Sequence, residues 1–232
     1  MVELLKERLK GLAAERIIQV ITEEWGQKAV LSTSFGIEDQ VLTHMVAQAG
    51  AKIDVFTLET GRLFPETYYV WNRTLEYYKI KIKTYYPQAA LVEEMVTQKG
   101  PSSFYESVEN RKECCYIRKI EPLRRAIKGY YIWITGIRAE QSPNRESMDF
   151  VEWDAGNQII KIHPLFAWSL QEVEDYIKKH HIPYNPLHDK GYPSIGCQPC
   201  TRAIREGEDF RAGRWWWEDK SKKECGLHIT QS

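Results

Sequence analysis

The chain has 232 residues, of which 43% are hydrophobic and 28% charged, a composition that supports one substantial core and hardly two full domains. Its 32 Lys and Arg residues balance 32 Asp and Glu residues, so no net field attracts nucleic acid or acidic lipid. No apolar run approaches the roughly 20 residues of a membrane span, and the N-terminus lacks the unbroken apolar core of a signal peptide. We therefore expect a cytoplasmic protein without nucleic-acid or membrane partners, whose cysteines stay reduced.

Strands and helices alternate along the first two thirds of the chain. Apolar residues at helical spacing in residues 1–25 predict one N-terminal helix. Short runs rich in β-formers predict strands at 28–34, 53–60, 80–87 and 130–136, and amphipathic patterns predict helices at 36–50, 65–79 and 88–98 and in the cysteine-rich segment. This alternation predicts an α/β fold built on a mostly parallel sheet with helices on both faces.

The segments STSFG, ETGR and TGIRAEQS each follow a predicted strand. Ligands of open α/β sheets bind beyond the carboxyl ends of the strands, so we expect these three segments on one rim of the sheet. In STSFG, small hydroxyl residues and a glycine at a strand-to-helix junction suit an oxyanion, although an ordinary capped turn has the same pattern.

The last third departs from this rhythm. Residues 149–165 predict a hairpin that turns at DAGN, and 169–180 predict a helix with a capping box between Ser169 and Glu172. Beyond Ile182, Pro, Gly and aromatic residues interrupt every period, which predicts loops and short helices in an irregular C-terminal extension.

Four of the five cysteines form two close pairs, Cys114–Cys115 and Cys197–Cys200. Two such pairs can converge on one soft metal site, because thiolates bind zinc or iron–sulfur clusters. Adjacent helical residues point about 100° apart, which strains a single-ion site and favours a larger cluster. Structural zinc, or unliganded buried thiols in the first pair, are the alternatives that spacing leaves open.

Basic residues lie near these sulfurs and near the fifth cysteine. Arg118 and Lys119 follow the first pair by about one helical turn, and RAGRWWW places Arg211 and Arg214 at a helical i, i+3 spacing. Cys225 has lysines before it and His228 after it, which favours its thiolate and makes it a candidate nucleophile. A solvated charged face and an ordinary surface cysteine are the simpler readings of these patterns.

Together these segments resemble the assimilatory adenylyl-sulfate (APS) and phosphoadenylyl-sulfate (PAPS) reductase family. The matching stretches run in family order from about residue 32 to 228: STSFGIED, LETGRLFPET, CCYIRKIEPL, TGIRAEQS, HPLFAW, YNPLHDKGYPSIGCQPCT, GRWWW and ECGLH. Chains with both cysteine pairs resemble the cluster-containing, APS-reducing branch. The resemblance implies an adenine nucleotide alpha hydrolase-like fold, with a nucleotide- and cluster-binding domain at 1–206 and a flexible tail at 207–232.

The resemblance also implies a site. Cys114, Cys115, Cys197 and Cys200 would hold a 4Fe–4S cluster, and Cys225 would be the catalytic nucleophile. The substrate-binding set would be Ser32, Ser34, Lys119, Arg138, Arg211, Arg214 and His228. Many relatives carry a second Arg where this chain has Ala139, which leaves Arg138 as the single guanidinium of that motif.

The implied reaction is thioredoxin-dependent reduction of APS to sulfite and AMP through an S-sulfocysteine, in sulfate assimilation and cysteine biosynthesis. Thioredoxin or a similar dithiol would be the partner, and the sequence leaves PAPS use and a homo-oligomer open. An ATP pyrophosphatase-like enzyme would want an SGGxDS loop, which STSFGIED lacks, and a nucleotide-binding cluster sensor would give Cys225 no role.

Overall fold

The computed structural model describes residues 1–50, 52–141 and 148–218, and the structural statements below concern these residues. Its strands are β1 (Ala29–Ser32), β2 (Asp54–Leu58), β3 (Ile82–Tyr85), β4 (Ile132–Ile134), β5 (Val151–Asp154) and β6 (Ile159–Ile162). They form one sheet in the order β3-β2-β1-β4-β6-β5. All neighbours are parallel except β5 and β6, which confirms the predicted mostly parallel sheet.

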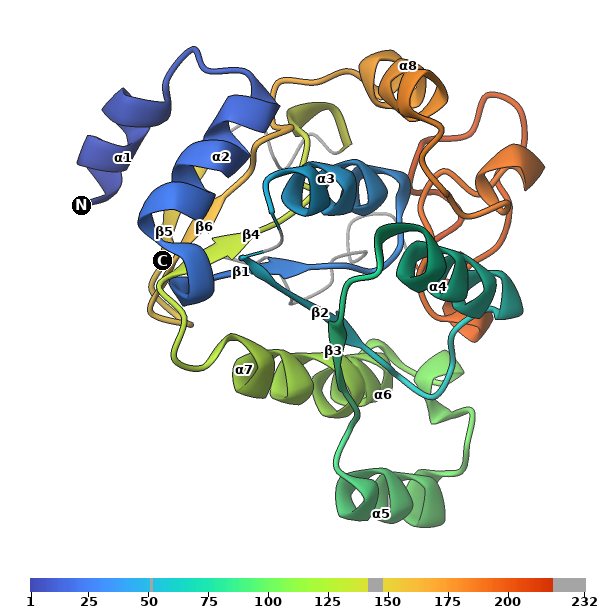
Figure 1. Cartoon of the computed structure of the whole chain (residues 1–232). Helices are drawn as coiled ribbons and strands as arrows, with labels where there is room; N and C mark the ends of the chain where they lie inside the picture. The colour runs from blue at the N-terminus through green and yellow to red at the C-terminus, as the bar shows by residue number, and fades with distance from the viewer. Residues whose placement is uncertain (51, 142–147, 219–232) are drawn as a thin grey trace.

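Helices cover both faces of this sheet, as predicted (Figure 1). The α-helices are α1 (Val2–Leu9), α2 (Ala14–Glu24), α3 (Ile37–Gln48), α4 (Pro65–Tyr78), α5 (Ala89–Lys99), α6 (Val108–Cys115), α7 (Glu121–Ile127) and α8 (Leu170–His180). One face packs its alternate strand residues, such as Leu31 and Ile134, against α1, α2, α3 and α8. The opposite face packs Val30, Phe56 and Trp133 against α7.

The N-terminal region forms two helices, where the sequence predicted one. Helix α1 ends at Leu9, Gly11 has a φ of 73°, and α2 begins at Ala14. Glycine adopts this left-handed conformation without the Cβ clash that other residues meet, so the chain can turn there. Apolar periodicity persists across the break because both helices bury residues in the same core, among them Leu5, Leu9 and Ile18.

Helix α3 follows β1 directly and lies across the middle of the sheet (Figure 1). The sequence predicted an amphipathic helix there, but most of α3 is buried, including the polar residues Gln40, Thr43 and His44. The cause is its position between the sheet and the helices α2 and α8, both of which contact it. The Gln40 amide nitrogen donates to Thr74 Oγ1 at 2.8 Å, and Thr43 Oγ1 donates to the Asp39 carbonyl at 2.7 Å, so these two buried groups are hydrogen-bonded.

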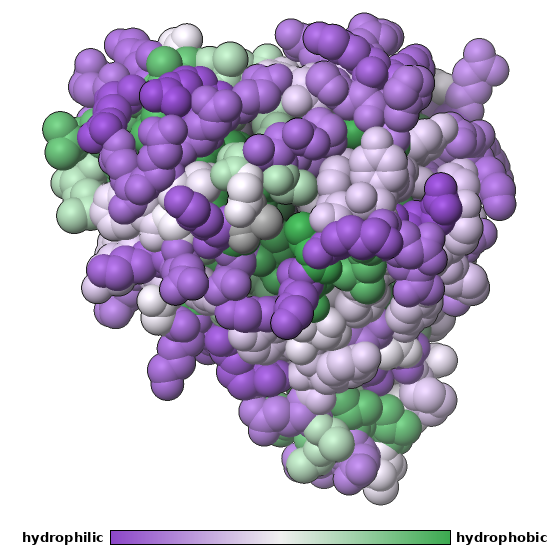
Figure 2. Space-filling view, in the orientation of Figure 1, coloured by the Kyte–Doolittle hydropathy of each residue, from purple (hydrophilic) through white to green (hydrophobic). Residues whose placement is uncertain are grey.

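The last third matches its predicted pattern closely. Strands β5 and β6 form the hairpin around the DAGN turn, and Ser169 and Glu172 form the capping box at the start of α8. After Ile182 the described residues form turns and short 3₁₀ helices. None of the described helices is both long enough and apolar enough to span a membrane. The face in Figure 2 is mostly hydrophilic, with hydrophobic side chains at its centre and over α5.

Candidate active site

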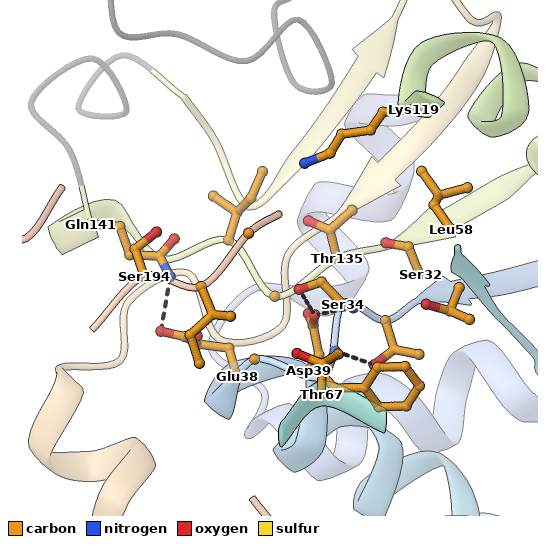
Figure 3. A pocket seen from close by; sticks show the side chains of 18 of the residues that line it. Ser32, Ser34, Glu38, Asp39, Leu58, Thr67, Lys119, Thr135, Gln141 and Ser194 are labelled. Carbon is orange, nitrogen blue, oxygen red and sulfur yellow. Dashed lines mark hydrogen bonds between the residues drawn. The ribbon is translucent and has the colours of Figure 1, made fainter. Parts of the chain in front are cut away.

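A cavity of about 460 Å³ opens at the carboxyl ends of β1, β2 and β4. The loop after β1 contributes Ser32 to Gly36, the end of β2 contributes Thr57, Leu58 and Thr60, and the loop after β4 contributes Thr135 to Ile137 (Figure 3). The three segments predicted to share a rim of the sheet therefore do so. The far wall comes from Pro193 to Cys197, and from Phe210, Arg211 and Arg214.

Gly136 allows the loop after β4 to pass close to the start of α3. A Cβ atom at this position would lie 2.6 Å from Asp39 Oδ1 and 2.9 Å from Glu38 Cβ. Any larger residue would push the two loops apart, so this glycine sets how closely two walls of the cavity approach.

Asp39 organises the turn after β1. Its Oδ2 accepts from the Ser34 amide and from Ser34 Oγ, both at 2.7 Å. Burial raises the pKa of Asp39 to about 6, although the bonds from Ser34 oppose that shift. Ser32 and Ser34, both predicted to bind substrate, line the cavity. Ser34 is however engaged with Asp39, and Ser32 Oγ accepts from Trp133 Nε1 at 2.9 Å.

Arg138, also predicted to bind substrate, does not line the cavity. Its guanidinium is buried and donates to Glu38 Oε1 at 2.9 Å and to Glu140 Oε2 at 2.7 Å. Gln141 Nε2 donates to the same Glu38 oxygen at 2.8 Å. Arg138 therefore neutralises and orients Glu38, which does line the cavity. The positive charge of Arg138 is already matched by the carboxylates of Glu38 and Glu140.

Three of the predicted cationic side chains do reach the cavity: Lys119, Arg211 and Arg214. Lys119 projects from the π-helical turn Tyr116–Ile120 that follows α6, and its amine lies apart from Glu38 and Asp39 (Figure 3). Arg211 lies on a turn and Arg214 forms an isolated antiparallel bridge with Thr201, so neither lies on the helix that their spacing suggested. The Arg214 Nη1 lies 3.3 Å from Ser194 Oγ and from the Ile195 carbonyl, while its buried Nε has no hydrogen-bond partner among the described residues.

The four paired cysteines converge on a second, smaller cavity next to the first. Cys114, Cys115, Cys197 and Cys200 line it, together with Arg118 and Lys119 and with Arg214 from the larger cavity. Lys119, Cys197 and Arg214 line both cavities, which places two cationic side chains beside the sulfurs. These four thiols form no disulfide with one another. Among the described residues, no group of three or more His, Cys, Asp or Glu side chains is arranged to hold a single metal ion.

The loop after β2 holds the second cysteine pair in place. Thr60 Oγ1 lies 3.3 Å from Cys197 Sγ, and the Arg62 carbonyl accepts from the Gln198 amide at 2.8 Å. Arg118 Nη1 donates to the Thr60 carbonyl at 2.6 Å and so links the helix with the first pair to the same loop. Burial, with Cys197 nearby, raises the pKa of Cys200 to about 12, and burial likewise raises the pKa of Cys114.

A buried ion pair ties the end of the described chain to the cysteine-bearing helix α6. Arg111 Nε and Nη2 donate to the two carboxylate oxygens of Glu218 at 2.9 and 2.8 Å. Both side chains are almost fully buried, with 1% and 3% of their surface exposed. The Arg111 guanidinium also lies 4.7 Å from the Trp215 ring, which Arg214 contacts from 4.9 Å. Residues 215–218 are thus fixed beside the cysteines.

Replacing Arg111 by Ala is expected to lower the free energy of unfolding by about 3–5 kcal/mol, because it leaves the Glu218 carboxylate buried without a partner. Equilibrium denaturation of the anaerobic protein measures this loss. The exposed Arg73, paired with Glu76, provides the matched control, and Arg73→Ala should change stability little. Equal losses in the two variants would contradict the buried-pair explanation.

Cys225 and His228, predicted as nucleophile and substrate ligand, lie outside the described residues, as does most of the expected tail at 207–232. The structure adds cavity residues that the sequence did not single out, notably Glu38, Asp39, Thr135 and His188. Glu38 and Asp39 stood inside the STSFGIED motif, but nothing in the pattern separated them from ordinary N-terminal helix acids. His188 stood inside the matching stretch YNPLHDKGYPSIGCQPCT, but nothing in that stretch marked it as a cavity residue.

Comparison with known proteins decides the family. The family model for the phosphoadenosine phosphosulfate reductase domain matches residues 28–203. The chain belongs to this family. The match spans the whole sheet and both cavities up to the second cysteine pair.

Relatives in several bacteria agree over nearly the whole chain. An adenosine 5′-phosphosulfate reductase of Sinorhizobium fredii is 48% identical over 228 residues, covering 98% of this chain and 90% of the relative. That of Allochromatium vinosum is 49% identical and covers 94% and 85%. A phosphate complex of the PAPS reductase from Candida auris superposes with a TM-score of 0.74 at 27% identity, covering 88% of this chain and 96% of that chain.

Flavin mononucleotide adenylyltransferase from Candida glabrata is similar in fold alone. It superposes with a TM-score of 0.57 at 13% identity, covering 100% of this chain and 84% of that chain. The sheet is therefore shared by enzymes of different chemistry, and function has to be argued from the cavity.

Proposed function

We propose that the protein reduces adenylyl sulfate to sulfite and AMP, as an oxidoreductase acting on a sulfur group in sulfate assimilation and cysteine biosynthesis. One observation carries the proposal: a cavity at the carboxyl ends of the strands has cationic side chains beside four cysteines. Bacterial proteins named adenosine 5′-phosphosulfate reductase share 44–51% identity with the chain over most of its length. Use of PAPS is the alternative.

The reaction needs a cation-lined pocket, because an anionic thiolate must approach an anionic sulfo group. Lys119, Arg211 and Arg214 would offset that repulsion and stabilise the phosphate that leaves as AMP. The Cys225 thiolate would attack the sulfur of APS, forming a bond between Sγ and sulfur while the bond from sulfur to the phosphate oxygen breaks. His228 and the cationic side chains would hold the phosphosulfate in place.

An external dithiol such as thioredoxin would complete the cycle. Its thiolate would attack Sγ of the S-sulfocysteine and expel sulfite, and its second thiol would resolve the mixed disulfide and regenerate the Cys225 thiol. The two electrons come from oxidation of the dithiol to a disulfide. The chain itself has no second cysteine near Cys225 in sequence to do this. The cytoplasm, where dithiol proteins are kept reduced, would be the compartment.

The four cysteines fit a 4Fe–4S cluster. Four sulfur donors from α6 and from the loop at 197–200 face one cavity, and Arg118 and Lys119 lie beside them to offset the charge of thiolate ligands. Each cysteine of such a cluster binds a different iron, so the adjacent pair in α6 need not share one ion. Bound there, the cluster would tie α6 to the loop after α8 through iron–sulfur bonds.

Anaerobic steady-state kinetics with APS, reduced thioredoxin and a sulfite assay test the function. We expect sulfite and AMP in equal amounts, with a larger kcat/KM for APS than for PAPS. ATP–pyrophosphate exchange by the same preparation, without sulfite release from APS, would instead identify an ATP pyrophosphatase-like enzyme. Nucleotide binding without either reaction would identify a sensor.

A further inference from the structure

His188 stands at the edge of the larger cavity, in the short helix His188–Lys190 that follows the loop after α8. Its Nε2 atom is buried and makes no hydrogen bond with any described residue. A buried polar atom without a partner is costly, and the few that native proteins retain at a cavity wall often meet a ligand. The reaction proposed above gives this atom no role.

The surroundings of His188 determine which form of the ring faces the cavity. Burial lowers the pKa of His188, with Glu38 and the backbone of Tyr192 opposing part of the shift. A backbone group that favours the charged ring is an acceptor, so the Tyr192 contact is with its carbonyl. We assign the proton of the neutral ring to Nδ1, because Tyr192 favours a proton on the ring and Nε2 is the nitrogen without a partner. Nε2 of the neutral ring then carries a lone pair and acts as an acceptor.

Glu38 adds a second acceptor to this end of the cavity. Arg138 and Gln141 both donate hydrogen bonds to its Oε1, which leaves Oε2 as a further acceptor. Lys119, Arg211 and Arg214 line the same cavity, and Figure 3 shows Lys119 well apart from Glu38. The cavity thus holds a cation, Lys119, and an acceptor carboxylate, Glu38, at separate places on its wall.

We infer that His188 Nε2, in the same cavity as Glu38, accepts a hydrogen bond from a ribose hydroxyl of the nucleotide and disfavours a phosphate on that hydroxyl. This inference rests on the proposed function. An anionic phosphosulfate beside Lys119 would leave the nucleoside to reach the acceptors, and a ribose diol offers two donors to them. Carboxylates bind ribose hydroxyls in this way in dinucleotide sites. A phosphate offers only acceptors and negative charge, so it would face a lone pair and a carboxylate.

Binding of AMP and of its 2′-deoxy and 3′-deoxy analogues, measured by calorimetry on wild type and His188→Ala, tests the inference. In wild type, loss of the contacted hydroxyl should weaken binding about threefold to tenfold, the usual effect of one hydrogen bond. In His188→Ala, AMP should already bind that much more weakly, and removal of the hydroxyl should cost nothing further. His188→Gln, which retains an acceptor, should recover part of the loss.

A matched control is His181→Asn, because His181 is exposed, lies outside the cavity and has a φ of 51° that Asn tolerates. This variant should bind all three nucleotides as wild type does. In turnover, His188→Ala should lower the ratio of kcat/KM for APS to that for PAPS by about threefold to tenfold. Circular dichroism melting should show the variants folded.

Two results separate the possible failures. If wild type binds AMP and releases sulfite from APS, but His188→Ala distinguishes AMP from its deoxy analogues as wild type does, the inference is wrong and the proposed function stands. If wild type binds no AMP and releases no sulfite from APS, both are wrong.

Discussion

Cys225→Ser is expected to abolish sulfite release, because a serine hydroxyl is a far weaker nucleophile than a thiolate. AMP binding should stay within about twofold of wild type, because the proposed anion contacts belong to other residues. Wild type incubated with APS and no reductant should release one equivalent of AMP and gain about 80 Da, the mass of an added SO₃ group, as a covalent intermediate requires. Intact-protein mass spectrometry measures that gain, and peptide mapping should place it on Cys225.

The other four cysteines serve as internal controls, since each faces the smaller cavity. Reduced thioredoxin added to the loaded wild type should discharge the adduct as sulfite. A sulfo group on Cys114, Cys115, Cys197 or Cys200, or turnover that survives in Cys225→Ser, would overturn the assignment of the nucleophile.

Local rules predicted the elements that position the site. The capping box of Ser169 and Glu172, the hairpin at DAGN and the three loops on one rim all follow from short-range patterns, and the structure confirms each of them. Such patterns act within a few residues, so one sequence carries them completely. The break at Gly11 was missed because apolar spacing continues across it, and only the backbone angle at the glycine reveals the turn.

The side chains of the site were harder to predict, because their partners are distant in sequence. The motif around Arg138 suggested a substrate contact, yet the partner that orients its guanidinium is Glu38, one hundred residues earlier. Arg111 was not singled out, and its partner Glu218 lies 107 residues away. His188 became a candidate only when its unpartnered Nε2 could be seen at the cavity wall. Sequence patterns name such residues, but the fold decides which charges are already paired.

Cys197→Ser is expected to remove the cluster that we propose for the smaller cavity. Anaerobically purified wild type should be brown and contain about four irons per chain, the content of one 4Fe–4S cluster. Loss of one of four ligands should bleach the visible absorption and lower the iron content to well below half. The thermal midpoint should fall too, because ligands from α6 and from the loop at 197–200 would no longer be joined through iron.

Cys225→Ser is the matched control for this prediction, since it replaces the same residue type outside both cysteine pairs. It should keep the colour, the iron and the thermal midpoint of wild type while losing turnover, which separates the nucleophile from the metal ligands. Absorption spectra and metal analysis of the three proteins, purified side by side under argon, decide the matter. Stoichiometric zinc in iron-replete anaerobic protein, or full iron content in Cys197→Ser, would show that the four cysteines serve another purpose. If Cys197→Ser loses iron and Cys225→Ser does not, the cofactor is bound where four cysteines converge on one cavity: Cys114, Cys115, Cys197 and Cys200.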